Sequence, residues 1–301
     1  MMSPETKMKT SQETKEPQER LGGGPWYEAW RRLRRNRIAM FGLGVVLCLM
    51  LVGALAGLMA PYDPYQIDLE NRLLPPSRSH LFGTDDFGRD IFSRTLYGAR
   101  ISLEVGILSR SVALSLGILL GVLAGYFGGK LDQLIMRLTD VMFAFPALLF
   151  LIGITAALKP SLTTLFLAIG FVGWAPMARL MRAQVLATKE NDYITAARAV
   201  GIGTGRIIRR HLFPNCLAPV IISFSMGMAA AIMAEASLSF IGLGAQPPTP
   251  SWGSMISLGR EYLRSAPWVT VYPGLAIGLT VLGFNLLGDG LRDALDPKMK
   301  V

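Results

Sequence analysis

Charge is scarce in this 301-residue chain, and cysteine and histidine are nearly absent. Only 17% of the residues are charged, 51% are hydrophobic, and the mean hydropathy is +0.40. This composition excludes a disordered chain, and it is more apolar than that of a soluble enzyme of this length. The two cysteines lack a CxxC spacing and cannot form a disulfide framework. With only two histidines as well, no metal site of imidazole and thiolate ligands is predicted.

Motifs of common catalytic sites are also missing. The loop GxxxxGK[ST] binds nucleotide phosphates, but the one Gly-Lys pair, Gly129-Lys130, lacks both the first glycine and the hydroxyl residue of that pattern. Neither HExxH nor GxSxG occurs. The sequence therefore predicts no catalytic residue and no nucleotide cofactor on this chain. The net charge of +9 is dispersed beside apolar runs, so nucleic acid is not an expected partner.

What the chain has is a series of long apolar runs. A segment that crosses a bilayer needs about 20 mostly apolar helical residues, because lipid cannot satisfy its peptide groups. The first run, residues 38–60, holds 23 residues without a charge. Six such runs predict an all-α polytopic membrane protein with six transmembrane helices. The predicted spans are residues 38–60, 101–127, 134–158, 162–180, 217–244 and 269–287.

The basic residues indicate an orientation. Five arginines between positions 31 and 37 immediately precede the first run, and basic residues resist translocation. We therefore expect the N-terminus in the cytoplasm, and six spans return the C-terminus there. The expected parts are a polar tail with a basic segment (1–37), a first span with an external segment (38–100), a five-helix core (101–290) that contains an inner loop (181–215), and a cytoplasmic tail (291–301).

The inner loop carries the most informative pattern. Residues 194–200 predict a short helix in which Ala196 and Ala197 would allow close approach by another surface. Gly201 would end that helix, because glycine readily adopts the left-handed terminal conformation. A second, basic helix is expected to stop before Pro214. The prediction is a rigid cytoplasmic helix, turn and helix between two spans.

This loop resembles the EAA loop of the membrane subunits of bacterial ABC importers: Glu-Ala-Ala, three residues, Gly, nine residues, then I-x-L-P. Ala196, Ala197, Gly201 and Pro214 match, whereas Thr195, His211 and Phe213 replace the usual Glu, Ile and Leu. The resemblance implies a loop that couples the spans to an ATPase subunit. Its expected coupling residues are Thr195, Ala196, Ala197, Arg198, Gly201, His211 and Pro214.

A second motif lies in the external segment and narrows the family. Residues 83–94 resemble the GTDxxGRDxxSR signature of the C-type dipeptide, oligopeptide and nickel permeases, and the similarity extends over about residues 31–297. The motif residues are Gly83, Thr84, Asp85, Gly88, Arg89 and Asp90.

The resemblance implies one subunit of an importer in the inner membrane of a bacterium. A B-type permease subunit would complete the pathway, two cytoplasmic ATPase subunits would bind ATP and Mg, and an external binding protein would deliver the substrate. Peptides are the expected substrate, with nickel or another small solute as the alternative. A self-contained secondary transporter would be expected to show an internal repeat with interrupted helices, which is not evident in the sequence.

Several residues within the predicted spans need a separate explanation. Glu235 would be either a pathway or gate residue or a helix-packing hydrogen-bond partner, and both interpretations stay open. Asp140, a second candidate for the pathway, lies three residues beyond Arg137, a spacing that permits an ion pair.

Glu104 and Arg110 lie about 240° apart around a helix and cannot pair with each other. Glycines 117, 121 and 125 recur every four residues and predict close packing against another helix.

Overall fold

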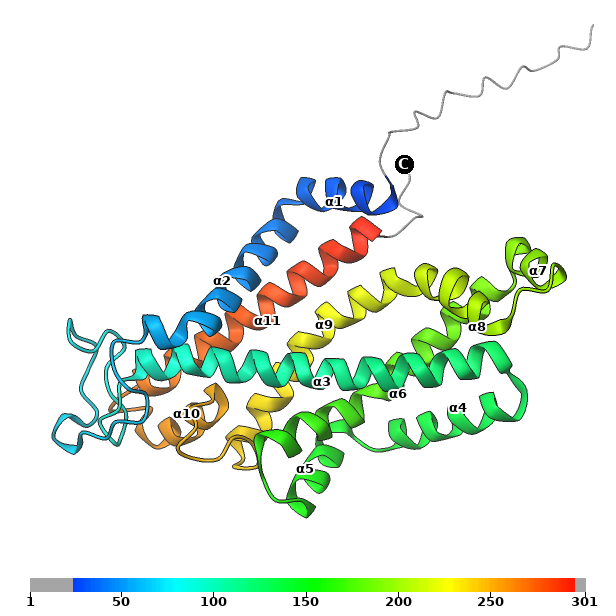
Figure 1. The fold of residues 1–301 in the computed structure, drawn as a ribbon. Helices are drawn as coiled ribbons and strands as arrows, with labels where there is room; N and C mark the ends of the chain where they lie inside the picture. Colours follow the sequence, from blue (N-terminus) through cyan, green and yellow to red (C-terminus); the bar gives the residue numbers. More distant parts are fainter. Residues whose placement is uncertain (1–23, 296–301) are drawn as a thin grey trace, which may run out of the picture.

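The computed structural model describes residues 24–295, which form a bundle of helices without a strand in that range (Figure 1). The long helices are accompanied by short 3-10 turns at Leu69–Asn71 and Arg260–Tyr262. The helices are α1 (Pro25–Arg35), α2 (Arg37–Met59), α3 (Ile91–Phe127), α4 (Gly129–Ala144), α5 (Ala147–Ala157), α6 (Leu162–Lys189), α7 (Asp192–Ala199), α8 (Thr204–Ile207), α9 (Phe213–Phe240), α10 (Trp252–Gly259) and α11 (Trp268–Leu295).

The first long helix, α2, packs along the last, α11, so the two ends of the described chain lie together (Figure 1). Asn36 separates α1 from α2, and its Oδ1 accepts hydrogen bonds from the backbone N–H groups of Ile38 and Ala39, which is an N-cap. Glycines let α2 and α11 approach: a Cβ on Gly42 would lie 2.8 Å from the Cβ of Leu286.

The most extensive packing in the bundle joins α3 to α6 through the glycines that recur every four residues. A Cβ on Gly117 would lie 2.5 Å from the Cβ of Met177, and one on Gly121 would lie 2.5 Å from the carbonyl oxygen of Ala178. Gly125 faces Val185 in the same way. The predicted close packing of this glycine series is confirmed, because a Cβ at any of the three positions would lie closer than 3.0 Å to an atom of α6.

One predicted span is not a continuous helix. The sequence predicted a single helix over residues 134–158, but α4 and α5 meet at an angle of 90° at a break before Pro146. Phe145 is extended, the conformation that a residue preceding proline prefers, and Pro146 has no N–H to continue the helix. Five helices of the described residues are long and apolar enough to cross a membrane, or six if this bent pair counts as one.

The inner loop also differs from the prediction. The second helix was expected to stop before Pro214, and that expectation is wrong: α8 passes through a π-helical turn (Ile208–Leu212) into α9, so helix runs from Thr204 to Phe240. The wider turn pairs the N–H of Phe213 with the carbonyl of Ile208. Proline lacks an N–H and crowds the preceding turn, and a π turn is one way in which a helix accommodates it.

Candidate functional site

The coupling residues predicted from the sequence lie at one end of the bundle. There α7 and α8 are placed beside the ends of α3 and α6 and the start of α9 (Figure 1). The inner side of α7 contributes Ile194 and Ala197 to an apolar cluster, so α7 packs against the bundle. The other buried members of this cluster are Met177, Met181, Val185, Ile207, Leu212, Cys216 and Val220.

The two alanines of the motif lie in different environments. Ala197 is 6% exposed and belongs to that cluster, whereas Ala196 is exposed, because consecutive helical residues point about 100° apart. Val200 is 76% exposed at the end of the same helix. The sequence had assigned Ala196 and Ala197 to one docking face, but only Ala196 can contact another protein. Exposed with it are Thr195, Arg198, Gly201 and Pro214, while His211 is half-buried.

Polar contacts fix α7 to its neighbours. The guanidinium of Arg198 lies 5.4 Å above the ring of Tyr126 at the end of α3. The same tyrosine is held to α6, because Lys189 Nζ donates a hydrogen bond to its carbonyl oxygen (2.9 Å). Asn215 Nδ2 in α9 donates to the hydroxyl of Tyr193 in α7 (3.2 Å). Polar contacts of α7 therefore reach α3 and α9, and its buried side belongs to the cluster that contains residues of α6.

Gly201 ends α7 as the sequence predicted. Its φ is +78°, in the left-handed region, and the N–H groups of Gly201 and Ile202 donate to the carbonyls of Arg198 and Ala197. This is the Schellman arrangement that follows many helices. Nothing lies within 4 Å of the position of a Cβ on Gly201, so the backbone conformation alone, and not space, favours glycine here.

At the opposite end of the bundle, Asp85 organises the external motif. One carboxylate oxygen accepts from the N–H groups of Phe87 and Arg89, both at 2.9 Å, and the other accepts from Arg89 Nε at 2.7 Å. Arg94 Nε lies 3.5 Å from the same carboxylate. These contacts hold the loop in a closed turn.

Asp90 joins this loop to α3. Its Oδ2 accepts from the N–H and the hydroxyl of Ser93, at 2.8 and 2.7 Å, and so caps the helix. Its Oδ1 lies 3.0 Å from His80 Nδ1. The helix therefore begins at Ile91 and includes a stretch that the sequence placed in the external segment.

Thr84 and the two glycines complete the turn. Thr84 Oγ1 donates to the carbonyl of Asn71 and accepts from the N–H of Leu74. Gly83 and Gly88 have φ of +76° and +74°, and a Cβ on Gly88 would overlap the carbonyl oxygen of Asp68. Each motif residue thus has a structural role in folding residues 61–90 over the start of α3.

Glu235 is fully buried between α3 and α9. Ser239 Oγ donates to its Oε1 (2.7 Å) and Ser102 Oγ donates to its Oε2 (3.2 Å). Both carboxylate oxygens are therefore satisfied within this chain, which favours the helix-packing interpretation over the pathway or gate.

Asp140 lies on α4 and pairs with α6. Its closer partner is Arg179 Nη2 at 2.5 Å, whereas Arg137, the partner suggested by the sequence, is 4.0 Å away. Asp132 and Arg182 form a second ion pair between the same helices. Sequence spacing indicates only local pairs, so the arginines of α6 could not be found from it, and the contacts give Asp140 a structural role.

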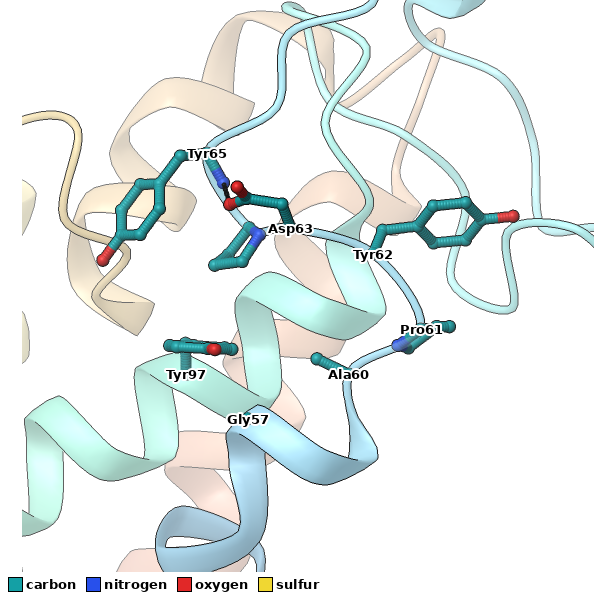
Figure 2. A pocket seen from close by; sticks show the side chains of 8 residues that line it. Gly57, Ala60, Pro61, Tyr62, Asp63, Tyr65 and Tyr97 are labelled. Atoms are coloured by element: carbon teal, nitrogen blue, oxygen red, sulfur yellow. Dashed lines mark hydrogen bonds between the residues drawn. The ribbon is translucent and has the colours of Figure 1, made fainter.

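A shallow cavity of about 400 Å³ lies between the end of α2 and the first turns of α3. Figure 2 shows the side chains of Tyr65 and Tyr97 on one side of it, and Asp63 accepting a hydrogen bond from the N–H of Tyr65 (2.8 Å). The cavity is lined by Gly57, Ala60, Pro61, Tyr62, Asp63, Pro64, Tyr65 and Tyr97.

Among residues 24–295 no group of three or more His, Cys, Asp or Glu side chains could hold a metal ion.

The long apolar helices define a multi-pass membrane protein, with α7 and α8 attached at one end of the bundle. The chain belongs to the family described as the binding-protein-dependent transport system inner membrane component, the permease subunits of ABC importers, whose model matches residues 117–301. A second model, the N-terminal TM domain of oligopeptide transport permease C, matches residues 24–76. The resemblance drawn from the two sequence motifs is confirmed.

Individual relatives cover nearly the whole chain. It is 48% identical to the dipeptide transport system permease protein DppC of Alkalihalophilus pseudofirmus, over 92% of this chain and 91% of that protein. It is 42% identical to DppC of Bacillus subtilis, over 91% and 86% of the two chains. It is 46% identical to the glutathione transport system permease protein GsiD of Escherichia coli, over 92% and 91%.

Solved structures share the fold at low sequence identity. The methionine ABC transporter MetNI in an inward-facing conformation matches with a TM-score of 0.54 and 19% identity, over 68% of this chain and 97% of that one. An amino acid ABC transporter matches with a TM-score of 0.52 and 15% identity, over 66% and 92%. The predicted all-helical permease fold is confirmed.

Proposed function

We propose that this chain is the C-type permease subunit of a bacterial peptide importer. It forms half of the pathway, and a B-type permease forms the other half. The names of its relatives support peptides as the substrate, since they include dipeptide and glutathione permeases from bacteria. Nickel or another small solute is the alternative that transport assays must exclude.

The observation that carries the proposal is the geometry of α7. One side of this helix is buried in a cluster with residues of α6, and its polar contacts reach α3 and α9, while Ala196 and Val200 leave the other side exposed. A small exposed face on an anchored helix suits docking into a groove of an ATPase subunit. Two such subunits bind ATP and Mg²⁺, and their closure moves the long helices through α7.

The orientation follows from the same assignment. Residues 181–215 and both termini lie in the cytoplasm, and residues 61–90 lie outside, where a binding protein delivers the peptide. Exposed arginines at the α7 end of the bundle support this orientation, because basic residues accumulate on the cytoplasmic side of a membrane. They are Arg198, Arg206, Arg209 and Arg210.

The test is site-directed crosslinking in the assembled transporter. Both native cysteines, Cys48 and Cys216, are first replaced by alanine, and single cysteines are then introduced at Ala196 and Ala197. We expect the cysteine at 196 to crosslink to an ATPase subunit and the one at 197, which is buried, to remain unreactive. Absence of any crosslink from position 196, or uptake of peptide by the chain without ATPase subunits, would contradict the proposal.

A second assay addresses the substrate. Vesicles that contain the complete transporter and its binding protein are given labelled dipeptide in competition with unlabelled dipeptide or with a nickel chelate. We expect ATP-dependent uptake that only the unlabelled dipeptide suppresses. Suppression by the nickel chelate alone would indicate that nickel, and not peptide, is the substrate.

A further inference from the structure

Arg110 lies near the middle of α3, a helix long and apolar enough to cross the membrane. Its guanidinium reaches across to α9, where Nη2 donates hydrogen bonds to the carbonyl oxygen (2.8 Å) and the hydroxyl (3.3 Å) of Ser223. A cation at this depth is costly unless it faces a partner or an aqueous path. The mechanism proposed above gives it no role.

Within residues 24–295 this cation has no counter-ion. No carboxylate of the described chain lies within 4.0 Å of the guanidinium, and Nε is buried without a hydrogen-bond partner there. Glu104, on the same helix, lies about 240° around the axis and is exposed. Ser223 is neutral, so its two acceptor oxygens position the guanidinium without cancelling its charge.

Glycines on two other helices make room for this side chain. A Cβ on Gly227 of α9 would overlap the guanidinium, and a Cβ on Gly173 of α6 would lie 3.7 Å from Nη1. Arg110 is only part-buried. The guanidinium therefore lies beside glycines of α6 and α9, with Nε buried and part of the side chain still accessible.

We propose that Arg110 binds the carboxylate of the peptide during its passage, which rests on the proposed function of a peptide importer. A carboxylate is the acceptor that matches the planar guanidinium, and Nη1, which is not fully buried and makes no hydrogen bond among the described residues, supplies the donor. A single charged contact attracts the cargo but still allows its release, as a pathway requires. The same charge repels a metal cation. An acidic side chain of the second permease, which would pair permanently with Arg110, is the competing occupant.

The first measurement asks whether position 110 faces water. Arg110→Cys is made in the Cys48→Ala, Cys216→Ala background and assembled with its partners, and Ala113→Cys on the buried side of α3 serves as the control. We expect a charged, water-soluble thiol reagent to modify the cysteine at 110 and not the one at 113. We also expect a transported dipeptide to slow that modification, because it would occupy the space beside position 110. An unreactive cysteine at 110 would overturn the proposal in favour of a sealed contact with the second permease.

The second measurement compares transport rates. Uptake of a dipeptide and of its C-terminal amide is measured with wild type, Arg110→Lys and Arg110→Gln at saturating binding protein. We expect Arg110→Gln to slow the free acid about tenfold, the loss of one charged hydrogen bond, and to leave the amide rate nearly unchanged. Arg110→Lys should restore part of the free-acid rate. Equal slowing of both peptides would overturn the proposal. If the wild-type complex transports no peptide at all, the proposed function is contradicted instead. The labelling experiment still tests whether position 110 faces water, because the accessibility of the cysteine does not depend on peptide uptake.

Discussion

Ala196 and Ala197 are adjacent in α7, yet Ala197 lies in the apolar cluster at the end of the bundle and Ala196 is exposed. The family motif places two small residues side by side for different reasons. Ala197 is buried in the chain's own cluster, which includes residues of α6 and α9, whereas the small size of Ala196 has a reason only if something docks on the outside.

Aspartate at these two positions should therefore separate transport from folding. We expect Ala196→Asp to change stability by no more than about 0.5 kcal/mol but to reduce uptake about tenfold or more, since it places a charge on the proposed docking face. Ala197→Asp should destabilise the protein by about 2 kcal/mol or more, because the carboxylate would be buried among apolar side chains. Thermal unfolding in detergent and uptake in vesicles measure the two effects. Normal uptake by Ala196→Asp would show that Ala196 does not contact an ATPase subunit.

The glycine series of α3 makes a prediction about packing. Gly121→Ala places a methyl group 2.5 Å from the carbonyl oxygen of Ala178, so α3 and α6 must move apart. We expect a loss of roughly 1–3 kcal/mol, the usual cost of overpacking, and a lower unfolding temperature in detergent. Gly278→Ala in α11 is the control, since nothing lies within 4 Å of that Cβ. An unchanged unfolding temperature for Gly121→Ala would mean that α3 and α6 can separate enough to admit a methyl group without loss of stability.

Much of the fold was predictable because hydropathy and spacing act locally. The long apolar runs predicted five continuous helices, and the glycine series predicted a close helix contact whose partner, α6, only the structure identifies. The break before Pro146 and the π turn before Pro214 were not predictable, because proline can end, bend or be accommodated by a helix according to what surrounds it. Both motifs identified the family, and the cap that Asp90 forms on α3 is a local contact. The partners of Thr84, the backbone groups of Asn71 and Leu74, are distant in the sequence and depend on the tertiary structure.

The two ion pairs between α4 and α6 should contribute unequally. Asp132 and Arg182 have side chains 17% and 33% exposed, whereas those of Asp140 and Arg179 are 52% and 44% exposed. Water screens exposed pairs, which contribute at most about 1 kcal/mol. We expect Asp132→Asn to lower the unfolding temperature clearly and Asp140→Asn to lower it slightly or not at all. If the two variants behave alike, burial does not determine the strength of these pairs, and added salt should then weaken both equally.

Asp86 in the external loop makes stability depend on pH. Burial, and secondly the charge of Asp85, raise the pKa of the Asp86 carboxyl above its ordinary value of 3.8, and its Oδ1 has no hydrogen-bond partner among the described residues. The folded state therefore holds this proton at a pH at which the unfolded chain has released it. Because of this difference, the contribution of Asp86 to stability falls as the pH rises from 3.8 through the raised pKa. Asp86→Asn removes the charge, and we expect it to stabilise the protein at neutral pH and to make no difference below pH 3.8. Unfolding of wild type and variant across this pH range measures the effect, and a variant that is less stable at neutral pH would show that attraction to Arg89 outweighs the cost of burial.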